Sequence, residues 1–365
     1  MQTIHGEPSF HLGTPELDLH VTARGGHMAP VVFHLPGRDV SPYALAPWEP
    51  SEHPNLPPLL SVLRGDFMCL PFSGQIAGPP HGETANAVWT KIDSDRNSLC
   101  MKIVTRDTGA TVEKTFSTRK GHHAIYFEHQ IKGLDGNFNY GTHPILDFSH
   151  LPEGAGRITT SPFHWASVFP GPFANSADGE TQALKECAEF SDLREVKLAA
   201  GGTTDLTHYP ARLGNEDLVM MSHPPATAEQ PFAWSAAVMD GYVWFALKNP
   251  VDFPSTLLWM SNGGRTAPPW NSRHLGRLGI EDVCSHFSDG VDKSRLDLLA
   301  GQGIRTTRKF SPDQTVSLRH IHAVAAVPEN FGAVAQILPT GEDSVKLIGE
   351  SGISVLASVN WKFFV

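Results

Sequence analysis

The chain has 365 residues and a formal net charge of −10, and only 18% of its residues are charged. It contains no basic run, which excludes nucleic acid and anionic membrane surfaces as partners, because both require a positive footprint. Its 33 glycines and 29 prolines give a turn-rich composition that is more typical of many short strands than of helices.

The four cysteines suggest a reducing compartment. Cys69, Cys100, Cys187 and Cys284 form no CxxC pair and no disulfide framework. The N-terminus lacks the basic start and apolar core of a signal peptide, and no apolar run approaches the ~18 residues of a membrane span. We therefore expect a cytoplasmic protein, with export by a leaderless route left open.

The first third of the chain is predicted to form strands joined by long loops. Residues 17–34 alternate and break at Gly25-Gly26, which predicts a hairpin. Residues 36–58 form a proline-rich loop with an exposed Trp48, and loops of this length are often functional or wrap over the surface. Residues 67–72 are an apolar strand that runs into a Gly/Pro loop containing His81, Gly82 and Glu83. Prolines before His81 and a glycine after it favour a stiff backbone that a ligand can approach closely.

Strands continue through the middle of the chain. Residues 87–132 alternate with period two between short polar turns, which predicts an antiparallel meander. His143 lies in an otherwise apolar strand, so its imidazole must face a cavity or be hydrogen-bonded; a core role and a site role both stay open. Residues 181–199 are the best helix candidate, and Asp240-Gly241 marks a hairpin.

Two features stand out near the C-terminal end. Residues 293–299 form a possible short helix. His320 and His322 are spaced i, i+2 on a predicted strand and so share a face. This spacing can chelate a metal, but no third ligand lies nearby in the sequence, so we predict no metal site.

The stretch 258–287 is the densest in polar functional residues. Gly263-Gly264 and Pro268-Pro269 bend its backbone, and a short apolar run delivers Glu281 and Asp282. A tryptophan among arginine, histidine and glutamate forms an apolar platform ringed by hydrogen-bonding groups, as a sugar ring requires. The plain alternative is a surface loop with a structural ion pair. No internal repeat or linker interrupts the chain, which favours one β-rich domain over residues 1–365 with two large packed sheets.

Three motifs resemble the galactose mutarotase-like superfamily of aldose 1-epimerases, and their layout is nearest to the hexose-6-phosphate epimerases. The first is Cys69-Leu70-Pro71-Phe72 followed by His81-Gly82 and Trp89. The second is Thr142-His143-Pro144, and the third is Gly279-Ile280-Glu281. Their order and rough spacing agree with the family from about residue 17 to residue 327.

The resemblance implies an all-β fold, a large antiparallel supersandwich of two packed sheets with a concave carbohydrate cleft. It also implies an isomerase that interconverts the anomers of an aldose without metal or organic cofactor. By carry-over, Glu281 is the general base at the anomeric hydroxyl, His143 is the acid at the ring oxygen, and His81 binds and polarises the sugar. Such chemistry needs an acid and a base with pKa values near the working pH.

Two departures bear on the substrate. Glu83 stands where the hexose-phosphate branch carries an aromatic residue and an arginine, and this disfavours a phosphate. Gln75 stands where free-sugar mutarotases carry an arginine. A neutral aldose, or a uronate held by Arg64, Arg265 or Arg273, fits at least as well as a sugar phosphate. The predicted substrate-binding residues are Arg64, Gln75, Glu83, Trp259, Asn262, Arg265, Trp270, Arg273, His274 and Asp282.

Other functions stay open at this point. The partner we expect is a small-molecule carbohydrate, and the protein is a monomer or a homodimer. The chain could be a non-catalytic carbohydrate-binding or sensor protein, since a fold does not fix a function. It could also be a lyase or hydrolase in which Glu281 and Glu83 act as carboxylates about 5–10 Å apart, or a structural all-β protein.

Overall fold

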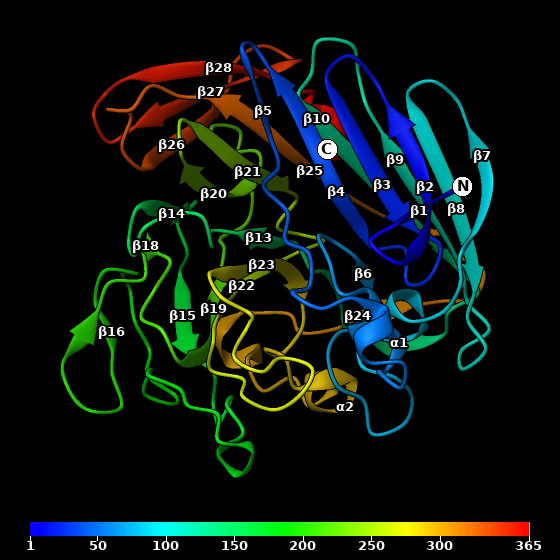
Figure 1. The fold of residues 1–365 in the computed structure, drawn as a ribbon, viewed down its shortest axis with the longest axis horizontal. Coiled ribbons are helices and arrows are strands. Elements are labelled where there is room, and N and C mark those ends of the chain that lie inside the picture. Colours follow the sequence, from blue (N-terminus) through cyan, green and yellow to red (C-terminus); the bar gives the residue numbers. More distant parts are fainter. Residues whose placement is uncertain (365) are drawn as a thin grey trace.

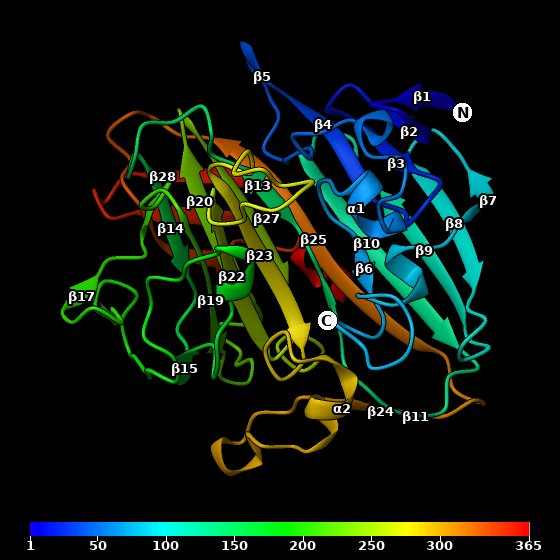
Figure 2. The ribbon, with the colours of Figure 1, turned by 60° about the horizontal axis from the view of Figure 1, so that its bottom comes forward.

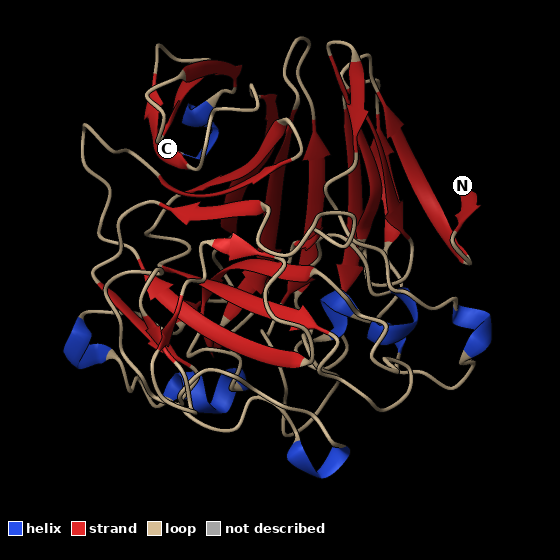
Figure 3. Cartoon of the chain, turned by 60° about the vertical axis from the view of Figure 1, so that its left-hand side comes forward, coloured by secondary structure: helices blue, strands red, loops and turns tan. Residues whose placement is uncertain are grey.

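The computed structural model describes residues 1–364 of the chain. Antiparallel sheets form its body, and the helices are short pieces at the periphery (Figure 3). The predicted all-β class is confirmed. The helical segments are α1 (Pro58–Val62), α2 (Gly290–Arg295), η1 (Pro50–Glu52), η2 (Glu83–Ala85), η3 (Ser176–Asp178), η4 (Ala300–Gln302) and η5 (Trp361–Phe364).

A nine-stranded antiparallel sheet runs through the whole molecule (Figure 1). Its strands, in spatial order, are β18 (His208–Tyr209), β14 (Gly156–Thr160), β20 (Ala233–Met239), β21 (Tyr242–Lys248), β25 (Val316–Ala326), β10 (Ala124–Lys132), β9 (Thr111–Ser117), β8 (Ser98–Val104) and β7 (Thr90–Ser94). The meander predicted over residues 87–132 is its β7–β10 edge, and the hairpin predicted at Asp240-Gly241 is β20–β21.

Two further sheets cover one face of this sheet. The seven-stranded sheet contains β15 (Trp165–Val168), β19 (Asn215–Ser222), β22 (Ser255–Asn262), β23 (Arg277–Cys284), β12 (Tyr140–Thr142) and β6 (Met68–Cys69), with β13 (Ile145–Asp147) paired to β23. The N-terminal sheet contains β1 (Gln2–Ile4), β2 (Glu7–Gly13), β3 (Leu17–Thr22), β4 (Met28–Leu35) and β5 (Arg38–Val40). The predicted hairpin over residues 17–34 is β3–β4.

Strand alternation divides the interior into separate cores. In β21, Trp244 and Ala246 belong to the core shared with the N-terminal and seven-stranded sheets, whereas Phe245 and Leu247 belong to a second core. Successive side chains of a strand point to opposite faces, so the nine-stranded sheet is buried on both sides. The second core is closed by η5 and by β26 (Val334–Pro339), β27 (Ser344–Gly349) and β28 (Ser354–Ser358). Two small pairs complete the fold, β11 (Gly136–Phe138) with β24 (Arg308–Phe310) and β16 (Val196–Lys197) with β17 (Thr203–Thr204).

Three local predictions need correction. Residues 181–199 are not a helix: they form turns and β16, and Leu184 pairs with Leu198 through an isolated bridge, so tertiary contacts override a weak helical period. Trp48 is not exposed. Its indole is 4% exposed, donates Nε1–H to the Leu60 carbonyl and packs edge-on against Trp270. The short helix predicted at 293–299 begins earlier and is α2.

The face of the seven-stranded sheet turned away from the nine-stranded sheet carries a third core. Loops and the short helices α1 and α2 gather on this side of the molecule (Figure 2). Within residues 1–364, no helix is long and apolar enough to cross a bilayer. This outer face of the seven-stranded sheet positions the candidate site.

Candidate functional site

A cavity of about 140 Å³ opens on the outer face of the seven-stranded sheet. A water takes about 30 Å³ in the liquid, so this volume holds about five waters. Its walls are mostly aromatic and aliphatic, and a few polar groups converge on it. The lining residues are Leu59, Leu60, Leu63, Phe67, Phe72, Ser73, His81, His143, Phe173, Leu218, Trp259, Arg265, Trp270, Glu281 and Ser288.

Strand register places Trp259 and Glu281 together in the cavity. Leu257 of β22 pairs with Glu281 of β23, and Trp259 pairs with Gly279. Side chains two residues apart on a strand share a face, so Trp259 and Glu281 both project outward. Gly279 lies between them, where an added Cβ would be 2.5 Å from Glu281 Oε1. The absent side chain leaves the room that the carboxyl group occupies.

His143 reaches the same cavity from the turn between β12 and β13. Its backbone N–H donates to Asp66 Oδ1 at 2.9 Å, and its ring stacks on Phe67 with centroids 4.6 Å apart. Its Nε2 lies 3.3 Å from Glu281 Oε1. The backbone is therefore anchored on one side while the imidazole is held against the carboxyl group on the other.

Burial favours the uncharged forms of both groups. Burial raises the pKa of Glu281 well above its usual value, and the nearby Arg265 guanidinium offsets only part of this effect. Burial also lowers the pKa of His143 well below its usual value, and the neighbouring His81 adds to the shift. Both shifts favour a protonated carboxyl group beside a neutral imidazole over an ion pair.

His81 presents a defined tautomer to the cavity. Its φ of 62° is left-handed, and its backbone N–H donates to the Ser73 carbonyl at 2.7 Å. The Ser73 backbone N–H in turn donates to Nδ1 of the ring at 3.2 Å. Burial lowers the pKa of His81 to about 3, so the ring is neutral and its proton must reside on Nε2. The ring is therefore a hydrogen-bond donor 5.0 Å, centroid to centroid, from the ring of His143.

Arg265 and two tryptophans form the polar and aromatic rim. The guanidinium lies over Trp270 at 4.6 Å and over Trp259 at 5.2 Å. Its Nε is 3.5 Å from Glu216 and 4.0 Å from Glu180. The guanidinium of Arg265 therefore packs on two aromatic rings, and the carboxyl groups of Glu216 and Glu180 partly balance its charge.

Five of the predicted binding residues brace the site without lining the cavity. Asp282 follows Glu281 on the strand and so faces the opposite side, where it pairs with Lys248 at 2.6 Å. Asn262 accepts from the Gly276 N–H, and Gln75 donates to the Phe72 and Ser73 carbonyls. His274 bonds Ser261 Oγ and stacks on Trp259, and Arg64 donates to the carbonyls of Ile4, His5 and Val62. These five residues therefore do not line the cavity, where the sequence analysis placed them.

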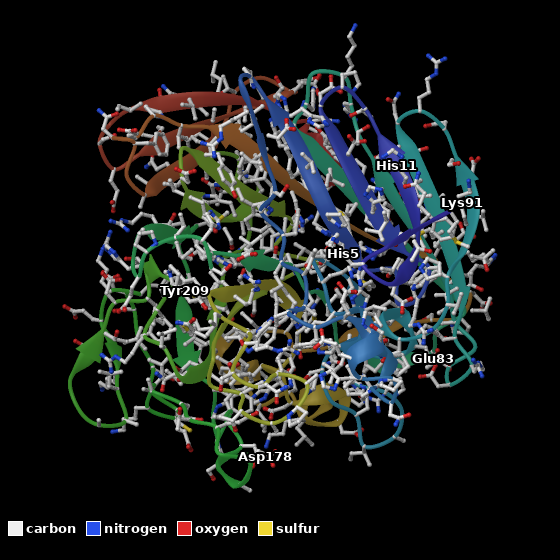
Figure 4. The ribbon with its side chains drawn as sticks, in the orientation of Figure 1. His5, His11, Glu83, Lys91, Asp178 and Tyr209 are labelled. Carbon is white, nitrogen blue, oxygen red and sulfur yellow. The ribbon has the colours of Figure 1, made fainter. Side chains whose placement is uncertain are left out.

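Two more predicted residues point elsewhere. Arg273 pairs with Glu52 at 3.1 Å on the surface. Glu83 accepts hydrogen bonds from the Arg106 and Asp107 backbone N–H groups beside the nine-stranded sheet (Figure 4). Among residues 1–364, Glu281 is the one carboxylate that lines the cavity. Glu83 is therefore not the second carboxylate that the hydrolase alternative requires.

The sequence reading missed several lining residues. Phe67 and Phe72 lie in the apolar strand that the sequence analysis predicted, but nothing in the sequence distinguished them from core residues. Ser288 and Phe173 come from loops in which no pattern marks them. His81, His143, Trp259, Arg265, Trp270 and Glu281 are the predicted residues that the fold does bring to one cavity.

Comparison with known proteins identifies the fold. No protein-family model and no curated protein matches the sequence. Solved structures do match: an aldose epimerase homologue from C. elegans (TM-score 0.59, 10% identity, 88% of this chain and 100% of that one) and a galactose mutarotase-like protein from Clostridium acetobutylicum (0.59, 9%, 89% and 98%). A galactose mutarotase related enzyme from Lactobacillus acidophilus matches with a TM-score of 0.55 at 10% identity, over 88% and 98% of the two chains. The chain has the galactose mutarotase-like β-sandwich fold, as its motifs indicated.

Proposed function

We propose that this protein is an aldose 1-epimerase-like isomerase that interconverts the anomers of an aldose or aldose derivative. The observation that supports this most directly is the buried contact of 3.3 Å between His143 Nε2 and Glu281 Oε1 inside a cavity with aromatic walls. An acid and a base in contact suit a hemiacetal, because its two oxygens are bonded to the same carbon.

The reactive state arises by one proton transfer within the pair. When the proton moves from the Glu281 carboxyl group to His143 Nε2, the pair becomes a carboxylate and an imidazolium. The carboxylate takes the proton of the anomeric hydroxyl while the imidazolium protonates the ring oxygen. The bond from C1 to the ring oxygen breaks, and a C1 carbonyl forms.

Ring closure uses the uncharged pair that opening leaves behind. After the aldehyde turns about the C1–C2 bond, His143 takes the proton of the attacking hydroxyl and Glu281 returns a proton to the carbonyl oxygen. The product is the other anomer, and the pair is again a carboxylate and an imidazolium. A positioned acid or base of this kind contributes roughly 10²–10⁴-fold to the rate.

The other cavity residues bind and orient the sugar in this proposal. Nε2–H of His81 donates to a sugar oxygen, and Trp259 and Trp270 form part of the apolar wall that the sugar ring contacts. Arg265 is the cation that we assign to the ligand, because it lines the cavity beside both tryptophans. A neutral aldose or a uronate fits this set. The cytoplasmic location is part of the proposal, and the four unpaired cysteines support it.

Anomer exchange observed by NMR or polarimetry tests the proposal. Pure anomers of neutral hexoses and of uronates are mixed with the wild-type protein, with Glu281→Gln and with His143→Asn. We expect exchange above the spontaneous rate with at least one sugar and losses of roughly 10²-fold or more in both variants. Sugar-dependent thermal stabilisation without exchange would indicate a binding protein instead. Unchanged exchange in both variants would overturn the assignment.

A further inference from the structure

A second cluster of ligand-type side chains lies in the core behind the cavity. Asp66 comes just before β6, and His320 and His322 share one face of β25. One ligand atom from each residue lies within 4.8 Å of the others, and all three side chains are buried. The sequence showed the two histidines but not the aspartate, which the fold supplies from the opposite sheet.

The imidazoles of this cluster have nitrogen atoms without protein partners. Among residues 1–364, neither ring nitrogen of His320 has a hydrogen-bond partner, and neither does Nε2 of His322. Buried polar atoms in folded proteins are nearly always satisfied, and an exception calls for an ion or an ordered water. Several unpartnered nitrogens beside a carboxylate therefore point to a ligand rather than to ordinary packing.

Neighbouring groups hold the three side chains in place. The ring of His320 stacks on Phe127 with centroids 4.3 Å apart. Nδ1 of His322 lies 2.9 Å from the Tyr43 hydroxyl oxygen, which can accept its proton and leave the Nε2 lone pair free. Asp66 uses Oδ1 for the His143 N–H, while Oδ2 faces His320 Nε2 at 3.9 Å. Partners that fix ligand orientation in this way are usual around protein metal sites.

We propose that Asp66, His320 and His322 bind one divalent transition-metal ion of the zinc type. Atoms at the corners of a triangle with sides of at most 4.8 Å lie within about 2.8 Å of its centre, so a contraction of about 0.7 Å gives zinc–nitrogen distances. Two imidazoles and a carboxylate are a donor set that zinc and cobalt accept. The ion would tie β25 to the segment before β6, whose Asp66 accepts the His143 N–H, and the inference does not depend on the proposed sugar chemistry.

Metal uptake during refolding tests this site. Because the cluster is fully buried, the full chain is unfolded with a chelator, refolded with or without ZnCl₂ or CoCl₂, and dialysed against the chelator. We expect one retained ion per chain, a cobalt absorption spectrum of nitrogen and oxygen ligation, and a melting temperature that rises with zinc. At free zinc 100-fold above its dissociation constant, the ratio of folded to unfolded protein should rise about 100-fold.

Matched variants separate this site from adventitious binding. Asp66→Asn and His322→Gln should lose the ion. The surface variant H11N/H34N removes two imidazoles that contact Asp18, that of His11 on β2 (Figure 4) and that of His34 on β4, and should retain the ion. Should the core variants fail to fold, wild-type crystals grown with zinc should show an anomalous scattering peak among the three side chains. Substoichiometric metal in the wild type, retention in the core variants, loss in the surface variant or no such peak would each overturn the proposal.

Discussion

The Cα of Gly279 faces the Glu281 carboxyl group so closely that an added methyl group would lie 2.5 Å from Oε1. The same methyl group would meet Trp259 Cβ at 3.1 Å. A side chain at position 279 therefore acts directly on the candidate base. The carboxyl end of Glu281 is flexible and can move, whereas the strand pair below it cannot move without breaking its register.

The first prediction concerns the substitution Gly279→Ala. It should displace the Glu281 carboxyl group from His143 and reduce kcat for anomer exchange by roughly tenfold or more, since small misplacements of catalytic groups are costly. The melting temperature should change little. Gly301→Ala is the control, because an added Cβ meets no atom within 4 Å there among the described residues. Full activity in Gly279→Ala would contradict the assigned position of the base.

The second prediction concerns the pH dependence of stability through Glu216. Burial raises its pKa from 4.5 to about 7. The native state therefore holds a proton that the unfolded chain has released, and the free energy of unfolding falls as pH rises from about 4.5 to about 7. At 1.36 kcal/mol for each pKa unit, the full loss is about 3 kcal/mol.

The variant Glu216→Gln should remove this loss. Trp259 Nε1 and Ser261 Oγ now donate to different oxygens of the carboxyl group, at 3.1 and 2.8 Å, and the amide oxygen of glutamine keeps one of these two acceptors. Denaturant unfolding of both proteins at pH 5 and pH 8 measures the difference. Between pH 5 and pH 8, the free energy of unfolding of the variant should rise relative to that of the wild type. A difference in unfolding free energy that stays the same at both pH values would refute the raised pKa of Glu216.

The third prediction separates the backbone role of His81 from its side-chain role. Its φ of 62° suits asparagine far better than alanine. His81→Asn should therefore fold with nearly wild-type stability but show a higher KM, because the Nε2–H donor is lost. His81→Ala should lose a further 1 kcal/mol or so of stability, since left-handed backbone costs roughly 1–2 kcal/mol for an ordinary residue. Equal KM values for His81→Asn and the wild type would exclude sugar binding by this histidine.

The fourth prediction is the pH dependence of exchange itself. Burial raises the pKa of Glu281 above the ordinary carboxyl value of 4.5, and the proposed cycle needs the proton that Glu281 passes to His143. The value of kcat/KM should therefore fall as the pH rises, along a limb displaced above 4.5. Glu83→Gln should leave the limb in place, because Glu83 lies outside the cavity. A limb at the ordinary carboxyl value would show that a solvated group controls the rate.

The local sequence pattern was sufficient to predict some residues of the candidate site and insufficient to predict the others. The alternation of β23 could have excluded Asp282 once Glu281 was assigned, because neighbouring residues of a strand cannot face one cavity. Arg64 and Arg273 could not be excluded in this way, since their partners, the Ile4 carbonyl and Glu52, lie far along the chain. The helix predicted at 181–199 failed because a weak period carried no information about the strands that compete for its apolar residues.

Asp66 joins two parts of the molecule that otherwise have separate tasks. One of its oxygens holds the backbone of His143, and the other faces His320 in the deep interior. Substitutions in the buried core can thus shift the imidazole of His143, to which we assign a catalytic role, without changing any residue that contacts the sugar. Relatives that diverge only in their cores would then differ in turnover while recognising the same ligands.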